Sequence, residues 1–354
     1  MSSFKLEHEI VELPLAQPFT IARGTKKTVR NVIVKLSKDG MTGYGEAAPN
    51  KRYDEDAEKV IQFLKQLSES FFDDIKTPEQ LESSMKSAES PKSAQSAIQM
   101  SWLDWWGKSQ HQPLWKLWEA PSNKTPTTSY TIGLDTTEVM QQKVEAAAEY
   151  PILKVKLGTD RDQEIIQAIR EITDKPIRVD ANEGWTSIEE AKQQISFLAE
   201  QNIEIVEQPM PSSMSAEMKE LKQWSLLPLM ADESFMGDEN LDEIAECFDG
   251  INIKLAKIGS LVKAREVIKQ ARERDLKVMI GCMIESSVGI SAGALLGTWA
   301  DYVDLDGNLL IKGDPFKGPE LDEEKRLVLG EQAGLGVRRQ EGSGGRQEGS
   351  GGRQ

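Results

Sequence analysis

The chain has 354 residues, enough for one large domain and a smaller one. Hydrophobic residues make up 38% and charged residues 29%, a balance typical of soluble globular proteins. The net charge of −15 at pH 7 argues against a basic surface for nucleic acid and favours a small-molecule ligand. The first residues contain no apolar signal segment, and no apolar run has the length of a membrane span, so we expect no membrane partner.

The counts of cysteine and histidine are both low. Cys247 and Cys282 are the two cysteines, and simple buried thiols in a reducing cytoplasm are the default interpretation. We therefore expect a cytoplasmic protein, and we further expect a homo-oligomer. His8 and His111 are the two histidines, and both precede the part of the chain in which the charged motifs occur.

Residues 1–125 are typical of an α+β domain. The stretches "FKLEHEIVEL", "NVIVKLSKDG" and "MTGYGEAAP" favour antiparallel strands, with "KDG" as a turn. Helical spacing of apolar residues follows in three segments, at 54–67, 77–85 and 92–108. Five of the eight tryptophans lie between Trp102 and Trp118, where a helix core or domain interface is a better explanation than ligand stacking.

From residue 127 onwards, short apolar runs alternate with amphipathic helical segments. Eight such runs occur, from "TTSYTIGL" to "YVDLDGN", and the segments between them begin with Asp or Ser as helix caps. This pattern predicts an α/β fold, a (β/α)7β TIM-like barrel over 126–314 with the N-terminal α+β domain as a cap. We expect residues 315–337 to return to the capping domain. The Gly/Ser-rich tail at 338–354 carries a seven-residue repeat and should be flexible.

The run "ILKVKLG" contains two lysines inside a strand that is otherwise apolar. Lys154 and Lys156 are two residues apart, so both side chains point to the same face of the strand, into the barrel. Charged residues recur in the following runs at intervals of 22 to 27 residues, at Asp180, Glu207, Asp232 and Lys254. Because the carboxyl ends of barrel strands form the active site, this constant phase predicts one cluster of charges at the barrel mouth.

Three carboxylates in this series, Asp180, Glu207 and Asp232, come from neighbouring strands. They would repel one another unless a cation lies between them, and Mg²⁺ prefers such oxygen ligands. The alternative is a structural cluster in which the carboxylates pair with Lys154, Lys156 and Lys254. Function is the favoured interpretation, because barrel mouths are where perturbed groups usually serve chemistry.

The strands that carry Lys156 and Lys254 lie on either side of the three carboxylate strands. A substrate carboxylate bound at the metal would therefore lie between two amines. This arrangement suits removal of a proton α to a carboxylate, with the metal stabilising the enediolate and the second lysine returning the proton to the opposite face. Such a two-base reaction is a racemisation or epimerisation. The neighbouring charge of Lys154 should lower the pKa of Lys156 from about 10.4 towards a value useful for a base.

The chain resembles the muconate-lactonising-enzyme subgroup of the enolase superfamily. The resemblance rests on "KVK", "VDAN", "VEQP", "ADES" and "NIKLAKIG", and extends to about residue 335. It implies that Asp180, Glu207 and Asp232 bind one Mg²⁺ and that Lys156 and Lys254 form the acid/base pair, with Lys154 in support; a lysine or histidine base with Mg²⁺ is the known chemistry of this superfamily. Branches that use a histidine base are excluded, because neither histidine lies in the barrel.

The last strand carries "VDLDGN", in which Asp304 and Asp306 share one face. This pair resembles the DxD signature of dipeptide epimerases, where it binds the N-terminal ammonium. The resemblance implies an L-Ala-Xaa substrate with its carboxylate at the metal, inverted at the Cα of the C-terminal residue. The alternative is an aspartate pair that only caps loops at the barrel end.

The loop at about 15–28 resembles the mobile specificity loop of this family. Phe19 and Ile21 would line an apolar wall, and Met283 would shape the pocket from the strand-seven segment "CMIESS". If Arg23 points in, Ala-Glu from cell-wall peptides is the expected substrate; if it points out, Ala with a hydrophobic residue is expected. Three further polar residues are expected to support the site: Asn182, Glu233 and Glu285.

Two other functions fit parts of the same pattern. An o-succinylbenzoate synthase or N-succinylamino-acid racemase would use the same lysines and metal, but its substrate has no free ammonium for Asp304 and Asp306. A non-catalytic, metal-dependent binding barrel would need the carboxylates but not both lysines. The dipeptide epimerase is therefore the favoured prediction.

Overall fold

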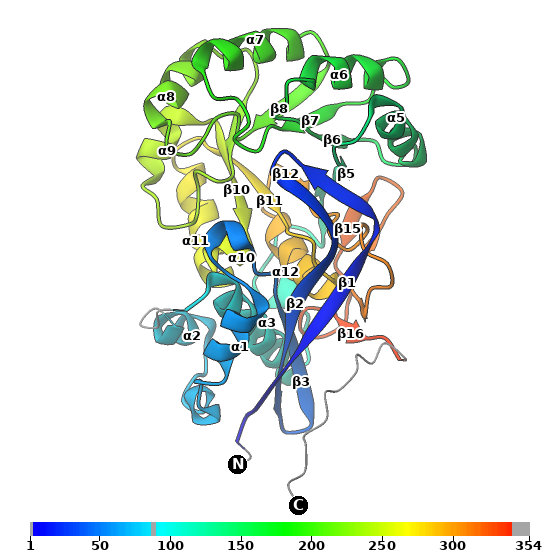
Figure 1. The fold of residues 1–354 in the computed structure, drawn as a ribbon. Coiled ribbons are helices and arrows are strands. Elements are labelled where there is room, and N and C mark those ends of the chain that lie inside the picture. Colours follow the sequence, from blue (N-terminus) through cyan, green and yellow to red (C-terminus); the bar gives the residue numbers. More distant parts are fainter. Residues whose placement is uncertain (1–2, 86–89, 342–354) are drawn as a thin grey trace, which may run out of the picture.

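The computed structural model describes residues 3–85 and 90–341, and the N-terminal part forms a capping domain (Figure 1). Its three strands form an antiparallel sheet in the order β1-β2-β3. Helical segments follow at the positions that the sequence pattern predicts. The elements are β1 (Lys5–Ile21), β2 (Gly24–Lys38), β3 (Met41–Ala47), η1 (Lys51–Tyr53), α1 (Ala57–Leu64), η2 (Glu69–Phe72), α2 (Pro78–Met85), α3 (Lys92–Ser109) and α4 (Leu114–Leu117).

Helix α3 lies directly against β3, and two glycines make this close approach possible. A Cβ added to Gly45 would overlap the carbonyl oxygen of Ala97, and one added to Gly43 would overlap that of Ser101. Trp102, on the same helix, is fully buried, so the tryptophan-rich segment belongs to the core, as expected. The backbone contact of strand and helix thus defines the capping domain.

Replacing Gly45 with alanine should therefore lower the free energy of unfolding by about 1–3 kcal/mol or more, since the added methyl group has only backbone to displace. Denaturant titration of the variant measures this loss. Gly330→Ala is the matched control, because its Cβ would enter open space. A Gly45→Ala protein as stable as the control would contradict this packing.

The second domain is a parallel eight-stranded sheet with the strands in sequential order. Its strands are β5 (Tyr130–Ile132), β6 (Leu153–Lys156), β7 (Ile177–Asp180), β8 (Ile203–Glu207), β9 (Leu229–Ala231), β10 (Gly250–Lys254), β11 (Lys277–Gly281) and β12 (Tyr302–Asp304). A parallel bridge between Thr128 and Val303 brings the first and last strands together. The predicted TIM-like barrel with an N-terminal cap is confirmed.

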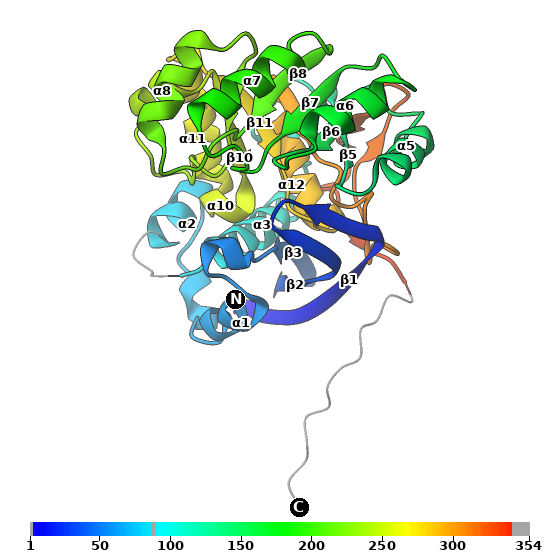
Figure 2. The same ribbon diagram turned by 45° about the horizontal axis from the view of Figure 1, so that its top comes forward.

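Helices cover the outside of the barrel, coloured from green through yellow to orange in Figures 1 and 2. They are α5 (Thr137–Ala146), α6 (Asp162–Arg170), α7 (Ile188–Leu198), α8 (Ser215–Trp224), α9 (Leu241–Cys247), α10 (Leu255–Ile258), α11 (Leu261–Arg272) and α12 (Ser287–Gly297). Side-chain caps begin several of them; for example, Ser187 accepts a hydrogen bond from the Glu190 backbone at the start of α7. None of the described helices combines the length and apolarity needed to cross a bilayer.

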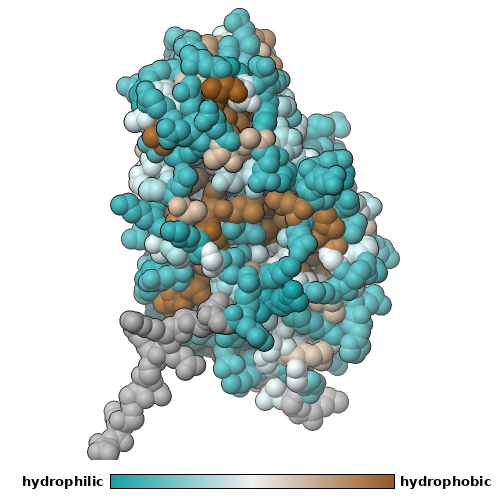
Figure 3. Space-filling view, turned by 90° about the vertical axis from the view of Figure 1, so that its right-hand side faces the viewer, coloured by the Kyte–Doolittle hydropathy of each residue, from teal (hydrophilic) through white to brown (hydrophobic). Residues whose placement is uncertain are grey.

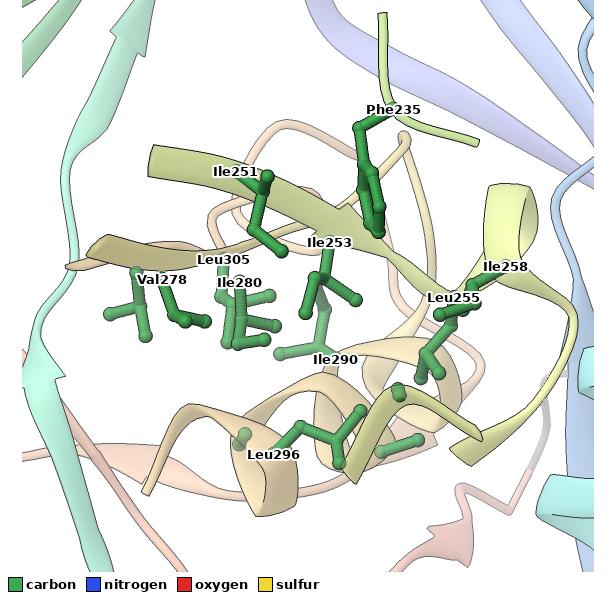
Figure 4. Packing of buried hydrophobic residues seen from close by; sticks show 14 of the residues in the cluster. Phe235, Ile251, Ile253, Leu255, Ile258, Val278, Ile280, Ile290, Leu296 and Leu305 are labelled. Atoms are coloured by element: carbon green, nitrogen blue, oxygen red, sulfur yellow. The ribbon is translucent and has the colours of Figure 1, made fainter. Parts of the chain in front are cut away.

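The layer between the strands and the outer helices forms the barrel's core. Ile251 and Ile253 of β10 and Ile280 of β11 point towards α12, which contributes Ile290 and Leu296 (Figure 4). All of these side chains are buried. Because the apolar side chains of these strands face the helices, the intervening side chains, including Asn252 and Lys254, face the barrel interior.

After β12 the chain contains four short strands. Two of them form a small sheet with β4, which precedes the first barrel strand, and the other two pair with each other. β14 (Glu320–Leu321) and β15 (Arg326–Val328) pair with β4 (Lys124–Thr127), while β13 (Phe316–Lys317) pairs with β16 (Arg338–Arg339). The prediction that the flexible tail begins at residue 338 is therefore wrong, because these two arginines complete a strand pair and Arg339 is ion-paired with Glu9. The remaining tail from residue 342 lies outside the described residues.

The β1–β2 hairpin, in blue in Figures 1 and 2, reaches from the capping domain to the barrel mouth. The Leu134 backbone donates a hydrogen bond of 2.9 Å to the Thr20 carbonyl, which fixes the hairpin beside the end of β5. A neighbouring face of the molecule is mostly hydrophilic, with hydrophobic side chains in a band across its middle (Figure 3). Because the hairpin lies beside the end of β5, its residues form one wall of the cavity described next.

Candidate active site at the barrel mouth

Three carboxylates meet at the carboxyl ends of neighbouring strands. Asp180 and Glu207 are the last residues of β7 and β8, and Asp232 follows β9 directly. All three are buried, and one oxygen from each lies within 4.8 Å of the others. The predicted convergence therefore exists, and it follows from the parallel register in which Asp180 is aligned with Glu207.

Each of these carboxylates also contacts a lysine. Lys156 Nζ lies 2.6 Å from Asp180 Oδ2, Lys254 Nζ lies 2.6 Å from Asp232 Oδ2, and Lys154 Nζ lies 2.6 Å from Glu207 Oε2. The pairs expected from a purely structural cluster are thus present. Lys156 and Lys254 also line an open cavity, however, and ammonium groups that serve only as buried counterions would not need this access.

The charges of the cluster shift the pKa values of the carboxylates in opposite directions. Burial opposes ionisation of Asp180, but Lys156 and Lys154 outweigh it and lower its pKa to about 2. Burial, followed by the charge of Asp180, raises the pKa of Glu207 to about 7. Ionisation of Glu207 is therefore the unfavourable step, and a cation among the three carboxylates would stabilise its negative charge.

The surroundings of the three carboxylates fit Mg²⁺. All three offer hard oxygen donors, which this ion prefers. Two further buried oxygens beside them, Asn182 Oδ1 and Glu233 Oε2, have no hydrogen-bond donor among the described residues. Unpaired acceptors of this kind suit the water molecules that Mg²⁺ retains. Asp180, Glu207 and Asp232 are thus the residues that would hold the ion.

Two residues of the cluster were not expected from the sequence. Lys257 is almost completely buried and donates to Asp232 Oδ1 at 2.6 Å. Asn252 Nδ2 donates to Glu207 Oε1 at 2.8 Å and so orients that carboxylate. Their spacing from Lys254 was the only signal in the sequence. Asn252 lies two residues before Lys254 in β10, and Lys257 lies three residues after it in α10.

The aspartate pair at the end of β12 lies in the same cavity, with Asp304 as the last residue of the strand and Asp306 two residues beyond it, but the two have different partners. Asp304 accepts hydrogen bonds from Lys154 Nζ at 2.7 Å and Ser129 Oγ at 2.8 Å. Asp306 accepts one from the Thr131 backbone at 2.6 Å. Burial, followed by the charge of Asp304, raises the pKa of Asp306 to about 7, and a nearby ammonium group would favour its ionised form.

A cavity of about 840 Å³ extends under the β1–β2 hairpin, and six residues of these clusters line it: Lys154, Lys156, Asp232, Lys254, Asp304 and Asp306. The predicted wall residues Phe19, Ile21 and Met283 line it. Arg23 also lines it, but its guanidinium is already bound, at 2.7 Å to the Asn182 carbonyl and 2.7 Å to Glu233 Oε1. The arginine therefore points in, yet it does not present a free charge to the cavity.

Glu285 is buried close to two charged side chains, the acid Glu46 and, with a weaker influence, Lys254. One of its oxygens accepts a hydrogen bond from the Met283 backbone. Burial, followed by the charge of Glu46, raises the pKa of Glu285 to about 8. Glu46 itself accepts hydrogen bonds from Ser286 at the start of α12. Glu285 thus belongs to the contact between the capping domain and the barrel.

Comparison with known proteins is consistent with this geometry. The chain is 40% identical over 331 residues to the L-Ala-D/L-Glu epimerase of Bacteroides thetaiotaomicron, covering 92% of this chain and 85% of that protein. The dipeptide epimerase of Enterococcus faecalis V583, solved with Mg and L-Leu-L-Tyr, has a TM-score of 0.84 at 30% identity, covering 95% and 99% of the two chains. The N-succinyl Arg/Lys racemase of Bacillus cereus has a TM-score of 0.86 at 27% identity, covering 96% of each.

Two family matches cover nearly the whole of the described structure. Residues 5–118 match the N-terminal domain of the mandelate racemase and muconate lactonizing enzyme family. Residues 137–343 match the enolase C-terminal domain-like family, and this range includes every residue of the carboxylate and lysine cluster. The chain belongs to the enolase superfamily.

Proposed function

We propose that the protein is a Mg²⁺-dependent epimerase of L-Ala-Xaa dipeptides, which inverts the Cα of the C-terminal residue. The observation that carries this proposal is that one end of the cavity suits a negatively charged group and the other end suits a positively charged group. The carboxylate triad with its metal suits an anionic group, and Asp306 suits a cationic one. A dipeptide zwitterion carries both charges, on two residues joined by one peptide bond. The names of the relatives support the same class of substrate.

Lys156 and Lys254 would carry out the proton transfers. They end strands β6 and β10, which are four positions apart in the eight-stranded order, so they approach the cavity from opposite sides. One amine would remove the α-proton, and the other ammonium would return a proton to the opposite face. Inversion needs this two-sided arrangement, because a single base would return the proton to the face from which it came.

The remaining groups would bind and orient the substrate. When bound, Mg²⁺ supplies positive charge that stabilises the substrate carboxylate as its second negative charge develops. Lys154 is held by Glu207 and Asp304 and adds a fixed positive charge. Residues of the β1–β2 hairpin line the cavity and would limit access of water to a bound substrate, which strengthens these electrostatic interactions.

A racemase of N-succinylamino acids is the second candidate, because the same lysines and carboxylates would serve it. An N-succinyl group is neutral at the nitrogen and anionic at its far end. Asp306 would then face no cation and would add repulsion. The buried acid at this position therefore favours the dipeptide.

Asp306→Asn should lower kcat/KM for a free dipeptide by about 10- to 100-fold, because it removes a charge-assisted hydrogen bond to the ammonium group. The effect should appear mainly in KM. N-acetyl-L-Ala-Xaa, which lacks the ammonium, should be a poor substrate whose kcat/KM changes little in the variant. Steady-state polarimetry on both substrates measures the difference.

Asp160→Asn, an exposed aspartate outside the cavity, is the control and should leave both substrates unaffected. An Asp306→Asn enzyme with unchanged kcat/KM for free dipeptides would contradict the ammonium site. Higher activity of the unmodified enzyme on N-succinylamino acids than on any dipeptide would favour the second candidate.

A further inference from the structure

Five basic side chains of the capping domain line the mouth of the active-site cavity, and three of them are neutralised. Arg23 pairs with Glu233 and Glu183, and Arg52 pairs with the same Glu183. Arg30 pairs with Glu58 at 2.6 Å. The other two, Lys26 and Lys51, have no ion pair among the described residues.

The contacts of Arg23 hold the hairpin on the barrel. Arg23 Nη1 donates to the Asn182 carbonyl and Arg23 Nη2 to Glu233, and these partners stand close to metal ligands on two different strands. Arg52 joins Glu183 from the neighbouring loop at 2.7 Å. Since Arg23 is used in this way, a negatively charged substrate side chain needs another cation.

Lys26 lies on the inner face of the hairpin. It is the cross-strand partner of Phe19, and directly opposed residues of an antiparallel pair place their side chains on the same face. The Phe19 ring packs close to Gly133 at the end of β5, so that face is turned towards the barrel. Lys26 lines the cavity, as do Thr25, Thr28 and Val29 around it, whereas the adjacent Lys27 does not.

The surroundings of Lys26 disfavour its charge while leaving it accessible. Its side chain reaches water, yet desolvation by the surrounding protein, with the nearby Arg23 as the second cause, lowers its pKa. No pair of opposite charge compensates it among the described residues. An ammonium group next to another cation, on the wall of a substrate cavity, is suited to receive an anion from the substrate.

We propose that Lys26 is the specificity-determining residue that binds a side-chain carboxylate on the C-terminal residue of the dipeptide, while Arg23 holds the hairpin closed. This inference rests on the proposed epimerase function and names its substrate class as dipeptides with an acidic C-terminal residue. The Lys26 ammonium would bind Glu or Asp side chains and would gain nothing from their amides.

The test compares kcat/KM for L-Ala-L-Glu and L-Ala-L-Gln, which differ by one charge at nearly constant shape. The unmodified enzyme should prefer L-Ala-L-Glu by at least about tenfold. Lys26→Met should lose roughly 10- to 100-fold on L-Ala-L-Glu and stay within about twofold on L-Ala-L-Gln, because only one charge-assisted contact is removed. Lys26→Arg should retain the preference.

Lys27→Met is the matched control, since it removes an adjacent lysine that does not line the cavity, and it should leave kcat/KM unchanged for both substrates. Lys51→Met tests the other unpaired cation and should leave the preference intact. Three outcomes would overturn the proposal. Lys26→Met could lower kcat/KM equally for both substrates, it could leave kcat/KM unchanged, or the selective loss on L-Ala-L-Glu could appear in Lys51→Met instead. An enzyme that epimerises dipeptides without preferring Glu to Gln overturns this inference alone, whereas no epimerisation of any dipeptide overturns the proposed function as well.

Discussion

Lys156→Ala should abolish exchange of the α-proton from one stereoisomer of the dipeptide and leave measurable exchange from the other. Lys254→Ala should show the opposite preference. The expected loss is about 10²- to 10⁴-fold for the affected isomer, the usual contribution of a positioned acid or base. The physical reason is that the two amines end strands on opposite sides of the barrel, so each would reach only one face of a substrate Cα that binds between them.

Deuterium incorporation from D₂O, followed by ¹H NMR on each pure stereoisomer, measures this difference directly. Full epimerisation should be lost in both variants, because inversion requires both lysines. Lys156→Met and Lys254→Met retain most of the aliphatic side chain and serve as controls for lost packing; they should behave like the alanine variants. Equal residual exchange with both stereoisomers in either variant would contradict the two-base scheme.

Removal of the divalent cation should lower the rate of exchange by at least about 10³-fold, since a metal contributes several kcal/mol of charge stabilisation in such sites. Dialysis against a chelator, followed by the same NMR assay, measures the loss, and added Mg²⁺ should restore activity. Mg²⁺ should also raise the melting temperature, because it binds the folded protein only. The chelated protein should remain folded, since Lys154, Lys156, Lys254 and Lys257 already contact the carboxylates.

Glu207→Gln separates the metal from general effects of the chelator. It removes one of the three negative charges, so it should weaken Mg²⁺ binding and reduce the thermal shift. The single amide oxygen can accept from Asn252 or from Lys154 but not from both, so the melting temperature of the Mg²⁺-free variant is measured beside its Mg²⁺ shift. Undiminished activity of the chelated enzyme, or an unchanged Mg²⁺ shift in Glu207→Gln, would contradict the metal site.

The barrel and the carboxylate cluster were predictable because both follow from a repeated local pattern. Each strand–helix unit returns the chain to the barrel mouth after a similar number of residues, so Asp180, Glu207 and Asp232 keep the same phase. The closeness of these side chains then depends only on parallel register, which the fold class supplies. No contact specific to this chain had to be known.

The partners of individual side chains were not predictable, since they depend on pairs far apart in the sequence. Arg23 donates a hydrogen bond to Glu233, which is 210 residues away in the sequence. This residue, predicted to contact the substrate, therefore fixes the hairpin to the barrel. Asp304 accepts hydrogen bonds from Ser129 and Lys154, so Asp304 and Asp306 differ in their freedom to bind a substrate. Strand β16 was missed because two arginines before a Gly/Ser-rich segment carry no strand pattern.

The central claim is that one substrate with charge at both ends is inverted at a single carbon. The most direct measurement incubates the Mg²⁺-loaded enzyme in D₂O with L-Ala-L-Xaa dipeptides, including L-Ala-L-Glu, and follows each Cα–H signal by ¹H NMR. We expect deuterium at the C-terminal Cα only, together with the L-Ala-D-Xaa product, while the alanine Cα–H stays unexchanged. Absence of exchange with every dipeptide, combined with turnover of an N-succinylamino acid, would contradict the claim.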